Sequence, residues 1–566
     1  MKIKTFFDYP HLPGFDQYQS SILGYNGITA ENIKEMLPDL NKQYDIQNYL
    51  DSMEPICKGK EFVEFIKNNK DKKYCIIGDY DCDGIMATSI LCYALVCIGI
   101  DCTFTIPDRF VSGYGMKREQ IDIALINKCD VIITVDNGIT ANDAIDYAHE
   151  HGMTVIVTDH HTPQGENHAD LCIDPLYNDE KFKGISGATV AMKLAYELYK
   201  EFNFDFILME DFVAMACITV FSDVMPMLNE NRIMVDAVLP YLDREVLVPG
   251  TFINRLAKLV DFYVPNRGTD PYLNLDGTFR KFNKDNIDFY FVPIINATNR
   301  VLGDVTDLVY DIMSLFVQEY NGIPHLYSGI NKKRKFMRTE LLRMYKPHPE
   351  SNAIVEALHP SKFDDNYSGI AGLVASDVAT SENKPALIGI DLDEPIIHFS
   401  GRSVGGFNLY GALEEIKNEH PELNFSFGGH AEALGAACTK EEIPLLEQYL
   451  SEKFTGVTVE EIEPTYFEMG DISFIKDAYV SLWPFGNKFV FPQFYVEDHI
   501  GFMNKDDRTF TFKKYGPYTP VKYFSNEVQN KLADYAFKHR DKKVKCIISF
   551  MEDENNQIML KLEKIL

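Results

Sequence analysis

The stretch from Tyr74 to Asp223 constrains the fold most, because it alternates short runs of β-branched residues with longer helical stretches. Five such runs follow one another, YCIIG, CTFTIP, VIITVDNGI, TVIVTDHH and LCIDP. Between them lie stretches such as IMATSILCYALVCIG and ANDAIDYAHEHG, which have the length and composition of helices. Strands that alternate with helices in this way predict a doubly wound parallel sheet of the α/β class.

Acidic residues and histidines gather where these predicted strands end. The residues concerned are Asp79, Asp81, Asp83, Asp136, Asp159, His160, His161 and, after a later apolar stretch, Asp223. One such residue alone is often no more than a helix cap or a turn. Together they are informative, because a doubly wound sheet brings the carboxyl ends of its strands to one edge, where ligands bind. Unpaired carboxylates would repel one another there, so the pattern predicts divalent cations.

The ligand types narrow the choice of metal and of chemistry. Mixed carboxylate and imidazole ligands favour manganese, or less specifically magnesium, cobalt or zinc, over calcium. Carboxylates that bridge two metal ions suit phosphoester hydrolysis, since the two ions activate a water molecule and bind a phosphoryl oxygen. The residue pattern alone therefore predicts metal-dependent hydrolysis of a phosphoester.

A calcium loop is the main rival for the first cluster, because Asp79-x-Asp81-x-Asp83-Gly84 copies the first half of an EF-hand loop. An EF-hand also needs a glutamate at loop position twelve and an entering helix. Here that position is Ile90, and the preceding KYCII is a β-rich run. The segment is therefore predicted as strand, acidic loop and helix. Asp81 and Asp83 are expected to bind metal directly, whereas Asp79 either binds metal or supports the loop.

Length and composition bound the class of protein. A chain of 566 residues exceeds one hydrophobic core, so roughly two to four domains are expected. It has no apolar run of about 18 residues, and its N-terminus lacks the pattern of a signal peptide. Its 11 cysteines include no C-x-x-C pair, which favours reduced thiols. We therefore expect a cytoplasmic protein with no membrane partner.

The net charge of −29 argues against a protein that coats nucleic acid nonspecifically, because such binding depends on phosphate neutralisation. An enzyme with a local basic channel is compatible with this charge, since the field depends on where the charges sit. The run NKKRKFMRTELLR at 331–343 is either such a basic patch or a solvated helix face.

Beyond the first unit the pattern of the chain changes. A region around 245–290 that contains VPNRGTDPYLNLDG predicts a domain boundary, and 303–345 is predicted to be mostly helical with a break at NGIPH. A second α/β unit follows, with YSGIAGLVAS, PALIGIDL, FSFGGHAEALGAA and the helical EEIPLLEQYLSEKF. The final residues, after EEIEPTYFE, combine aromatics with short alternating runs, which is typical of a small β-barrel or sandwich.

Several motifs resemble a known family. The segments GDYDCDG, VDNG, TDHH and FSD match in order and character the four motifs of the DHH phosphoesterase superfamily, and FSFGGHAEALGAA resembles the GGH signature of the associated DHHA1 domain. IPDRFVSGYGM, SDVMPMLNENR, PIINATNRVLGD, GINKKRKFMR and FSGRSVGGFNL resemble, within that superfamily, the RecJ-like single-strand-specific 5′-to-3′ exonucleases. The resemblance runs from about Lys73 to about Pro492, and the motif set is specific as an ensemble.

The resemblance implies a catalytic role for the clustered residues. The resemblance implies two metal ions, with Mn²⁺ preferred and Mg²⁺ or Co²⁺ as alternatives. The implied ligands are Asp79, Asp81, Asp83, Asp136, His160 and Asp223. Asp136 would bridge the two ions. His161 would face the scissile phosphate as a donor or general acid, and Asp159 would orient its neighbours.

The resemblance also implies a substrate-binding set in the second unit and in two loops. Its members are Arg109, Tyr114, Arg300, Ser400, Arg402, Ser403, Gly428, Gly429 and His430. The two glycines would let the backbone approach a phosphate, and Arg402 would bind it in a bidentate way. Arg300, with Arg109 and Tyr114, would grip the strand backbone or stack on a base.

The domains implied by the resemblance are four. They are a DHH catalytic domain with an N-terminal extension at 1–250, a connecting region with a helical linker at 251–345, a DHHA1 substrate-binding domain at 346–458 and an OB-like nucleic-acid-binding domain at 459–566. A cleft too narrow for duplex would admit only a single strand with a 5′ end. Trp483, Phe485 and Phe491 are candidates for stacking at its entrance or for core packing.

The implied function is exonuclease activity on single-stranded DNA in repair or recombination. A single-strand-binding protein or a helicase is the expected partner, and the enzyme is expected to be a monomer. Two positions depart from the family pattern, Ile294 in place of an arginine and Asn299 in place of a glycine. Two alternatives stay open. One is a DHH/DHHA1 phosphodiesterase of short oligoribonucleotides or cyclic dinucleotides, and the other is a non-catalytic replication scaffold.

Overall fold

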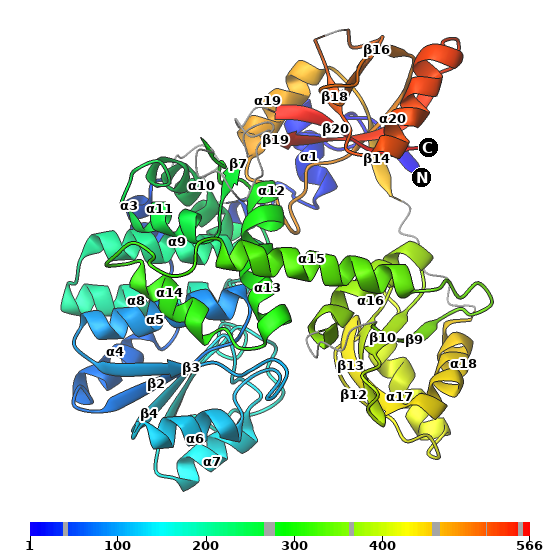
Figure 1. Cartoon of the computed structure of the whole chain (residues 1–566). Coiled ribbons are helices and arrows are strands. Elements are labelled where there is room, and N and C mark those ends of the chain that lie inside the picture. Colours follow the sequence, from blue (N-terminus) through cyan, green and yellow to red (C-terminus); the bar gives the residue numbers. More distant parts are fainter. Residues whose placement is uncertain (38–43, 265–277, 361–366, 456–463, 517, 553–557) are drawn as a thin grey trace.

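The computed structural model describes residues 1–37, 44–264, 278–360, 367–455, 464–516, 518–552 and 558–566 (Figure 1). The predicted boundary segment VPNRGTDPYLNLDG lies outside these ranges except for its first residue, and so does the predicted boundary between 458 and 459. Across the described ranges, none of the helices combines the length and apolar character needed to cross a bilayer.

Five parallel strands form the sheet of the first unit, in the spatial order β3-β2-β4-β5-β6 (Figure 1). Their bounds are β2 Lys73–Ile77, β3 Asp101–Thr105, β4 Val131–Val135, β5 Thr154–Thr158 and β6 Leu171–Ile173. Each strand coincides with one of the predicted runs, so the predicted parallel sheet is confirmed. The inner strands are buried on both faces, which explains their continuous apolar sequences.

Helices cover both faces of this sheet. One face is covered by α5 (Cys82–Cys97) and α8 (Gly187–Phe202), and the other by α6 (Arg118–Ile126) and α7 (Asn142–Glu150). Successive residues of β2 point to opposite faces of the sheet. Ile76 packs in the core with α5 and α8, and Ile77 packs in the core with α6 and α7. Helix α5 is apolar around its circumference because α8 and α9 (Phe206–Ser222) pack on it as well.

Shorter N-terminal helices and a helical connection complete the first unit. The N-terminal ones are α1 Gln17–Tyr25, α2 Ile33–Met36, α3 Ile46–Ser52 and α4 Gly59–Asn68. The connection contains α10 Asn229–Glu245, α11 Phe252–Leu259, α12 Lys284–Asn286, α13 Val292–Leu302, α14 Thr306–Ser314 and α15 Leu326–Met344. The predicted break at NGIPH is confirmed, because it falls between α14 and α15. The long α15 reaches from the first unit to the second (Figure 1).

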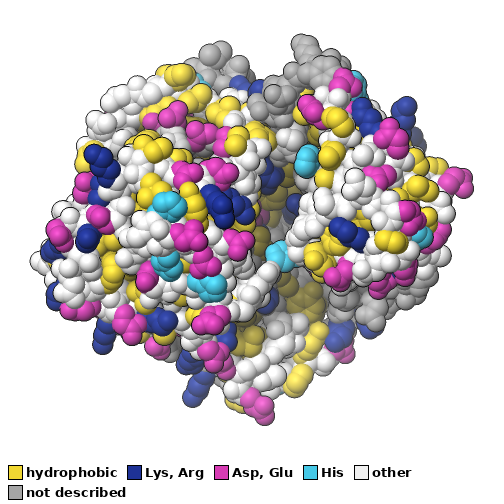
Figure 2. All heavy atoms as spheres, turned by 90° about the horizontal axis from the view of Figure 1, so that it is seen from below, with side chains coloured by type: hydrophobic (Ala, Val, Ile, Leu, Met, Phe, Trp, Pro, Cys, Tyr) yellow, Lys and Arg dark blue, Asp and Glu magenta, His cyan; other side chains and the backbone are white. Residues whose placement is uncertain are grey.

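The second α/β unit has a mixed sheet in the order β12-β13-β11-β10-β9. Its strands are β9 Ile354–Leu358, β10 Ala386–Ile390, β11 Ile396–Arg402, β12 Ser426–Gly429 and β13 Ala433–Thr439. The helices α17 (Leu409–Glu419) and α18 (Ile443–Phe454) share one core with it, while α16 (Ser368–Glu382) packs on β10 and β11. A hollow separates this unit from the first, and Figure 2 shows Lys and Arg side chains inside it.

The C-terminal region is β-rich, as predicted, and its sheet has the order β1-β14-β15-β19-β20-β18-β17-β16. The strands are β1 Lys2–Lys4, β14 Thr465–Glu468, β15 Phe494–Asp498, β16 Ile500–Asn504, β17 Thr509–Phe512, β18 Val521–Lys522, β19 Val544–Glu552 and β20 Ile558–Ile565, with α19 Ile472–Leu482 and α20 Asn526–Ala533. The sequence predicts the N-terminal residues as part of the first domain, but β1 pairs with β14. Aromatic packing favours this place, since the Phe6 and Phe467 ring centroids lie 4.9 Å apart.

A buried arginine joins the C-terminal region to the first unit. Arg232 of α10 is 5% exposed, and its guanidinium donates to the carbonyl oxygens of Leu482 (2.9 Å), Trp483 and Pro484 (2.6 Å). The guanidinium also lies over the Phe489 ring, 5.1 Å from its centroid. One side chain therefore satisfies three carbonyls at the segment that enters the C-terminal sheet.

We expect Arg232→Met to loosen this junction, because it leaves the three carbonyls without their donor. The free energy of unfolding should fall by about 2–4 kcal/mol, since each unpaired buried polar group costs on the order of 1–3 kcal/mol. Urea unfolding followed by the emission of Trp483, the one tryptophan of the chain, reports it directly. Arg244→Met, at a largely exposed arginine of the same helix, is the control, and equal midpoints for the two variants would contradict the assignment.

Candidate active site

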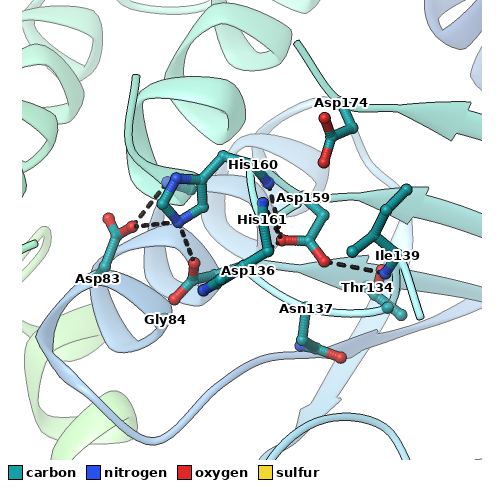
Figure 3. A network of polar contacts seen from close by, with 12 residues as sticks. Asp83, Gly84, Thr134, Asp136, Asn137, Ile139, Asp159, His160, His161 and Asp174 are labelled. Atoms are coloured by element: carbon teal, nitrogen blue, oxygen red, sulfur yellow. Dashed lines mark hydrogen bonds and ion pairs between the residues drawn. The ribbon is translucent and has the colours of Figure 1, made fainter. Parts of the chain in front are cut away.

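The carboxyl ends of β2, β4 and β5 bring the predicted acidic and histidine residues together. Figure 3 shows Asp83, Asp136 and His160 pointing toward one another, with Asp159 and His161 beside them. His160 Nε2 lies 3.0 Å from Asp136 Oδ1 and 3.6 Å from one carboxylate oxygen each of Asp83 and Asp223. The residues that follow β2, β4 and β5 thus meet at one point, as the parallel sheet predicts, and Asp223 joins them from the C-terminal end of α9.

Three ligand groups can be formed from these residues, each with atoms within 4.8 Å of one another. They are Asp79 with Asp81 and Asp136, Asp83 with His160 and Asp223, and Asp136 with His160 and His161. Asp136 is common to two of the groups, so it lies at the centre of the cluster. All six predicted ligands therefore fall within reach of a neighbouring ligand, and Asp79 is grouped like the others.

The cluster has the properties that a divalent cation requires. Three buried atoms have no hydrogen-bond partner among the described residues: Asp79 Oδ1, Asp136 Oδ1 and His160 Nε2. The last two lie 3.0 Å apart but are not aligned for a hydrogen bond. Burial, together with neighbouring carboxylates, holds the pKa of Asp79 and of Asp136 well above the ordinary value. Burial lowers the pKa of His160, which favours the neutral imidazole that binds metal. Hard oxygen donors with one imidazole fit manganese or magnesium.

The start of α8 fixes the Asp83 carboxylate. Asp83 accepts hydrogen bonds from the backbone N–H groups of Gly187 (2.6 Å) and Ala188 (2.9 Å), where the helix dipole also favours negative charge. Asp136 has a positive φ of 61°. A Cβ at Gly187 would lie 2.6 Å from Asp136 Oδ1, so only glycine leaves room for that carboxylate. The sequence marks Gly187 only weakly, because a Ser-Gly pair such as Ser186–Gly187 is common at the start of a helix.

Two asparagines of α13 hold the acidic loop from the other side. Asn296 Oδ1 accepts from the N–H of Cys82 (2.8 Å), and Asn299 Nδ2 donates to the carbonyl of Tyr80 (2.8 Å). Asn299 is one of the two departures from the family pattern, and here it supports the loop that carries Asp79 and Asp81. The other departure, Ile294, lies buried in the main core. Sequence reasoning missed Asn296, because its partner is 214 positions away.

Asp159 orients the two histidines. Its Oδ1 accepts from the N–H of His160 (2.7 Å) and lies 2.7 Å from His161 Nδ1, while its Oδ2 accepts from the N–H of Ile139 (2.9 Å). Burial alone would raise the pKa of Asp159, but the hydrogen bond and charge of His161 bring it below the ordinary value. Burial alone would lower the pKa of His161, and the same pairing raises it to about 9.

Tyr114 contacts the His161–Asp159 pair. Its hydroxyl is 3.3 Å from His161 Nε2 and 3.4 Å from the carbonyl oxygen of Asp136. The loop that carries Asp136 is fixed where it leaves β4 by Asn137, which donates to the carbonyls of Ile77 (3.0 Å) and Val135 (2.9 Å). Asn137 is therefore a supporting residue that the motif VDNG contains but that the sequence does not single out.

Arginines gather on the wall that faces the acidic loop. Burial, and then the charges of Arg109, Arg334 and Arg402, lower the pKa of Arg300 to about 9, while Asp81 opposes this shift. Burial and the charge of Arg109 also lower the pKa of Arg402. Cations that destabilise one another in this way are suited to binding an anion. We call Arg109, Arg300, Arg334 and Arg402 the arginine wall.

The arginine wall draws residues from both α/β units. Arg300 lies in the last turn of α13. Arg402 ends β11 beside α16, where a Cβ at Gly372 would lie 3.2 Å from its Nη2. Arg334 comes from α15, within the predicted basic run 331–343. Arg338 of the same run instead forms an ion pair with Asp377 of α16, at 2.6 Å. The predicted basic run is thus partly a patch and partly a contact between helices.

The remaining predicted residues lie on the sheet of the second unit. Ser400, Gly435 and Gly428 are adjacent across β11, β13 and β12, and the two glycines are exposed. Gly429 has a φ of 137°, and His430 is exposed at the turn that follows. The Ser403 hydroxyl donates to the carbonyl of Phe407 and so holds a turn. These small residues leave an open face beside Ser400 and Arg402.

The three aromatic candidates of the C-terminal region pack together. Trp483, Phe485 and Phe491 are half-buried and line a cavity of about 400 Å³, and the ring centroids of the two phenylalanines lie 5.0 Å apart. Tyr479 and Phe550 belong to the same aromatic cluster. These rings are therefore cavity walls rather than an open stacking platform.

Comparison with known proteins agrees with this geometry. Residues 73–218 match the model of the DHH family, N-terminal domain, and residues 351–456 match that of the DHHA1 domain. The chain therefore contains a DHH domain and a DHHA1 domain. The two matched segments contain the parallel sheet with its metal-ligand candidates and the mixed sheet with Ser400, Arg402 and the Gly428–His430 turn.

Curated relatives include the single-stranded-DNA-specific exonuclease RecJ of Bacillus subtilis, 30% identical over 417 residues, which are 71% of this chain and 48% of that protein. RecJ of Escherichia coli is 26% identical over 415 residues, which are 69% of this chain and 68% of that protein. YorK of the SPbeta prophage in Bacillus subtilis is 23% identical over 506 residues, 81% of each chain. The chain thus spans about half the length of the Bacillus subtilis RecJ that it matches.

Solved structures support the fold. RecJ of Thermus thermophilus in complex with Mn²⁺ superposes with a TM-score of 0.72 at 19% identity, covering 100% of this chain and 78% of that one. The same protein in complex with Mg²⁺ gives a TM-score of 0.66 at 18% identity, covering 100% and 77%. The predicted combination of a parallel-sheet unit, a helical connection, a second α/β unit and a β-rich C-terminal region is therefore confirmed.

We expect Gly187→Ala to weaken Mn²⁺ binding, because the added methyl group displaces the Asp136 carboxylate. Changes beside metal ligands typically cost about 10–100-fold in affinity, and a loss of that order should appear in calorimetric or EPR titration with Mn²⁺. Gly329→Ala is the matched control, since a Cβ there meets no atom within 4 Å. Unchanged Mn²⁺ affinity in Gly187→Ala would show that Asp136 does not take part in metal binding.

Proposed function

We propose that this chain is a metal-dependent exonuclease that hydrolyses phosphodiester bonds of single-stranded DNA from the 5′ end. The observation that carries the proposal is the buried cluster around Asp136 and His160, with its unpartnered atoms, beside an acidic loop whose Tyr80 ring lies 5.1 Å below the guanidinium of Arg109, a member of the arginine wall. Such an arrangement suits a phosphodiester held between cations on both sides. The similarity to proteins named single-stranded-DNA-specific exonuclease supports the choice of substrate.

We propose two metal sites that share Asp136, one with Asp79 and Asp81 and the other with Asp83, His160 and Asp223. Mn²⁺ is the preferred ion, because one imidazole among carboxylates suits it better than Mg²⁺. Bound ions of this kind supply Lewis-acid stabilisation of the phosphoryl oxygens and lower the pKa of the attacking water. His161 has a different task, since Asp159 holds its Nδ1 and so directs the ring.

The protein groups bind and orient the substrate. The arginine wall, with Ser400, takes the negative charge of the strand, and the open face formed by Gly428 and Gly435 lets the backbone come close. His161 keeps a proton near neutral pH, because pairing with Asp159 raises its pKa, so its ring can donate to a phosphate oxygen. Tyr114 limits the movement of that ring by its contact with Nε2.

The division into domains at 1–250, 251–345, 346–458 and 459–566 remains our proposal for how these tasks are separated, except that β1 belongs to the C-terminal sheet. The hollow between the two α/β units (Figure 2) would admit a strand end, and we propose that it favours unpaired DNA. Partnership with a single-strand-binding protein or a helicase, the monomeric state, a cytoplasmic location and a role in repair or recombination also remain proposals.

The test is a substrate panel with purified protein and Mn²⁺. Single-stranded DNA labelled at its 5′ or 3′ end, duplex DNA, single-stranded RNA, short oligoribonucleotides and cyclic dinucleotides are compared. We expect mononucleotide release from the 5′ end of the single strand and little attack on the duplex. Rapid cleavage of dinucleotides without attack on long strands would instead identify a small-molecule phosphodiesterase, and no turnover of any substrate would favour a scaffold.

Asp136→Asn and His160→Ala should abolish turnover, because the first removes the charge and the second the imidazole of a residue that belongs to two of the ligand groups. The expected loss in kcat is on the order of 10³-fold or more, as for removal of principal electrostatic groups. Turnover of the end-labelled strand gives kcat, and unfolding midpoints verify the fold. Asp146→Asn, at an exposed carboxylate outside the cluster, is the control, and retained activity in either ligand variant would exclude the assignment.

Arg300→Met should act on binding of the strand rather than on metal loading. We expect KM to rise about tenfold or more, because a charge-assisted contact to phosphate contributes on the order of 1.5–3 kcal/mol. Mn²⁺ affinity should stay the same. Arg118→Met is the matched control, because Arg118 lies on α6 with its guanidinium over the Tyr147 ring of α7. A fall in Mn²⁺ affinity with unchanged KM would contradict the role of the arginine wall.

A further inference from the structure

The aromatic cavity at the junction of the C-terminal region and the first unit is not used by the proposed mechanism. Its volume is about 400 Å³, within the range of roughly 300–1,000 Å³ typical of small-molecule sites. The walls are the rings of Tyr479, Trp483, Phe485, Phe491 and Phe550. A cavity walled by several rings suits a planar aromatic ligand, because each ring offers a face for stacking.

Polar groups at the same cavity supply a donor and an acceptor. Asn283 is 4% exposed, and its Oδ1 accepts from the N–H of Asn286 (2.9 Å), whereas its Nδ2 has no partner in the described parts of the chain. Glu552 accepts a hydrogen bond from the Tyr479 hydroxyl at 3.3 Å and one from the Trp483 side chain. A buried amide donor without a partner costs free energy, so its presence points to a ligand acceptor.

The cavity also continues toward the candidate metal centre. A second cavity of about 230 Å³ is lined by Ser222 and Val224, the two neighbours of Asp223, and shares Val224, Lys284, Gly486 and Asn487 with the first. Asn487 fixes this junction, since its Nδ2 donates to the carbonyl of Val224 (2.6 Å) and its carbonyl accepts from the N–H of Met227 (2.7 Å). The aromatic cavity therefore adjoins the loop that carries a candidate metal ligand.

We propose that the aromatic cavity binds a nucleobase, with guanine preferred. The rings would stack on the base, the Asn283 amide would donate to O6, and the Glu552 carboxylate would accept from N1–H and the 2-amino group, a pairing that only guanine offers among the four DNA bases. The cavity is lined by two carboxylates, Asp285 and Glu552, against one cation, Lys284, and this acidic balance disfavours a phosphate inside it, so the base enters and the phosphate stays outside.

The base comes either from a bound strand or from a free mononucleotide, and both sources share this recognition chemistry. The strand version rests on the proposed function, because it requires a single strand at the metal centre. The free-nucleotide version does not. Binding is therefore measured in EDTA, where the nuclease is silent, so that absence of exonuclease activity and absence of the base site are separate results.

Trp483 gives a direct readout, since it is the one tryptophan of the chain and lines the cavity. We expect saturable quenching of its emission by dGMP, at least about fivefold tighter than by dCMP, dAMP or dTMP, as expected for a good bidentate pair. Oligothymidylates with one guanine at successive positions from the 5′ end separate the sources. Quenching that depends on the position indicates a strand base, and equal weak quenching at every position alongside tight dGMP binding indicates a free nucleotide.

Variants test the two polar contacts. Asn283→Ala and Glu552→Gln should each weaken dGMP binding about fivefold or more, because a partner of a hydrogen bond is left unpaired. Glu527→Gln, at an exposed carboxylate on α20, is the matched control, and unfolding midpoints verify that each variant folds. Absence of quenching by every nucleotide, equal affinity for all four, or unchanged dGMP binding in both variants would overturn the proposal. Quenching by trimethyllysine but by no nucleotide would overturn it in favour of a cation-binding aromatic cage.

Discussion

Repulsion among buried carboxylates is the constraint on which the rest of the structure depends. Asp79, Asp83 and Asp136 are nearly inaccessible to water, yet they share one small volume at the edge of the parallel sheet. Buried charges of one sign are costly unless a counter-charge or hydrogen bonds compensate them. The fold supplies part of that compensation through the N–H groups at the start of α8, and the unpartnered atoms of Asp136 and His160 leave the rest to a cation.

The arginine wall obeys the same constraint with the opposite sign. Arg300 has a pKa lowered to about 9 because it is buried among other guanidinium groups, and Asp81 compensates it only in part. Two incompletely compensated sets of charge thus face each other, one acidic and one basic. A phosphodiester with divalent ions relieves both sets at once, so binding of metal and binding of substrate should reinforce each other.

Much of this was predictable from the sequence, and the exceptions share a physical cause. The strands, their parallel direction and the meeting of Asp79, Asp136 and His160 follow from local alternation and from the rule that ligands gather at strand ends. Asn296 could not be found in this way, because it acts on a backbone N–H far along the chain. Strand β1 was equally hidden, since three residues carry almost no pattern and their place depends on the aromatic cluster around Phe6 and Phe467.

Helix α13 links the two sets of charge and so sets the spacing of the site. Asn296 and Asn299 bind the backbone of the acidic loop, and the next residue, Arg300, belongs to the arginine wall. The same helix packs against α16 of the second unit, where a Cβ at Gly369 would lie 2.2 Å from the Arg300 carbonyl oxygen. A change in the position of the second unit must therefore move α13 or break this close contact. The distance between the acidic cluster and the arginine wall is in this sense a property of one helix, and Asn299, although a departure from the family pattern, helps to keep it constant.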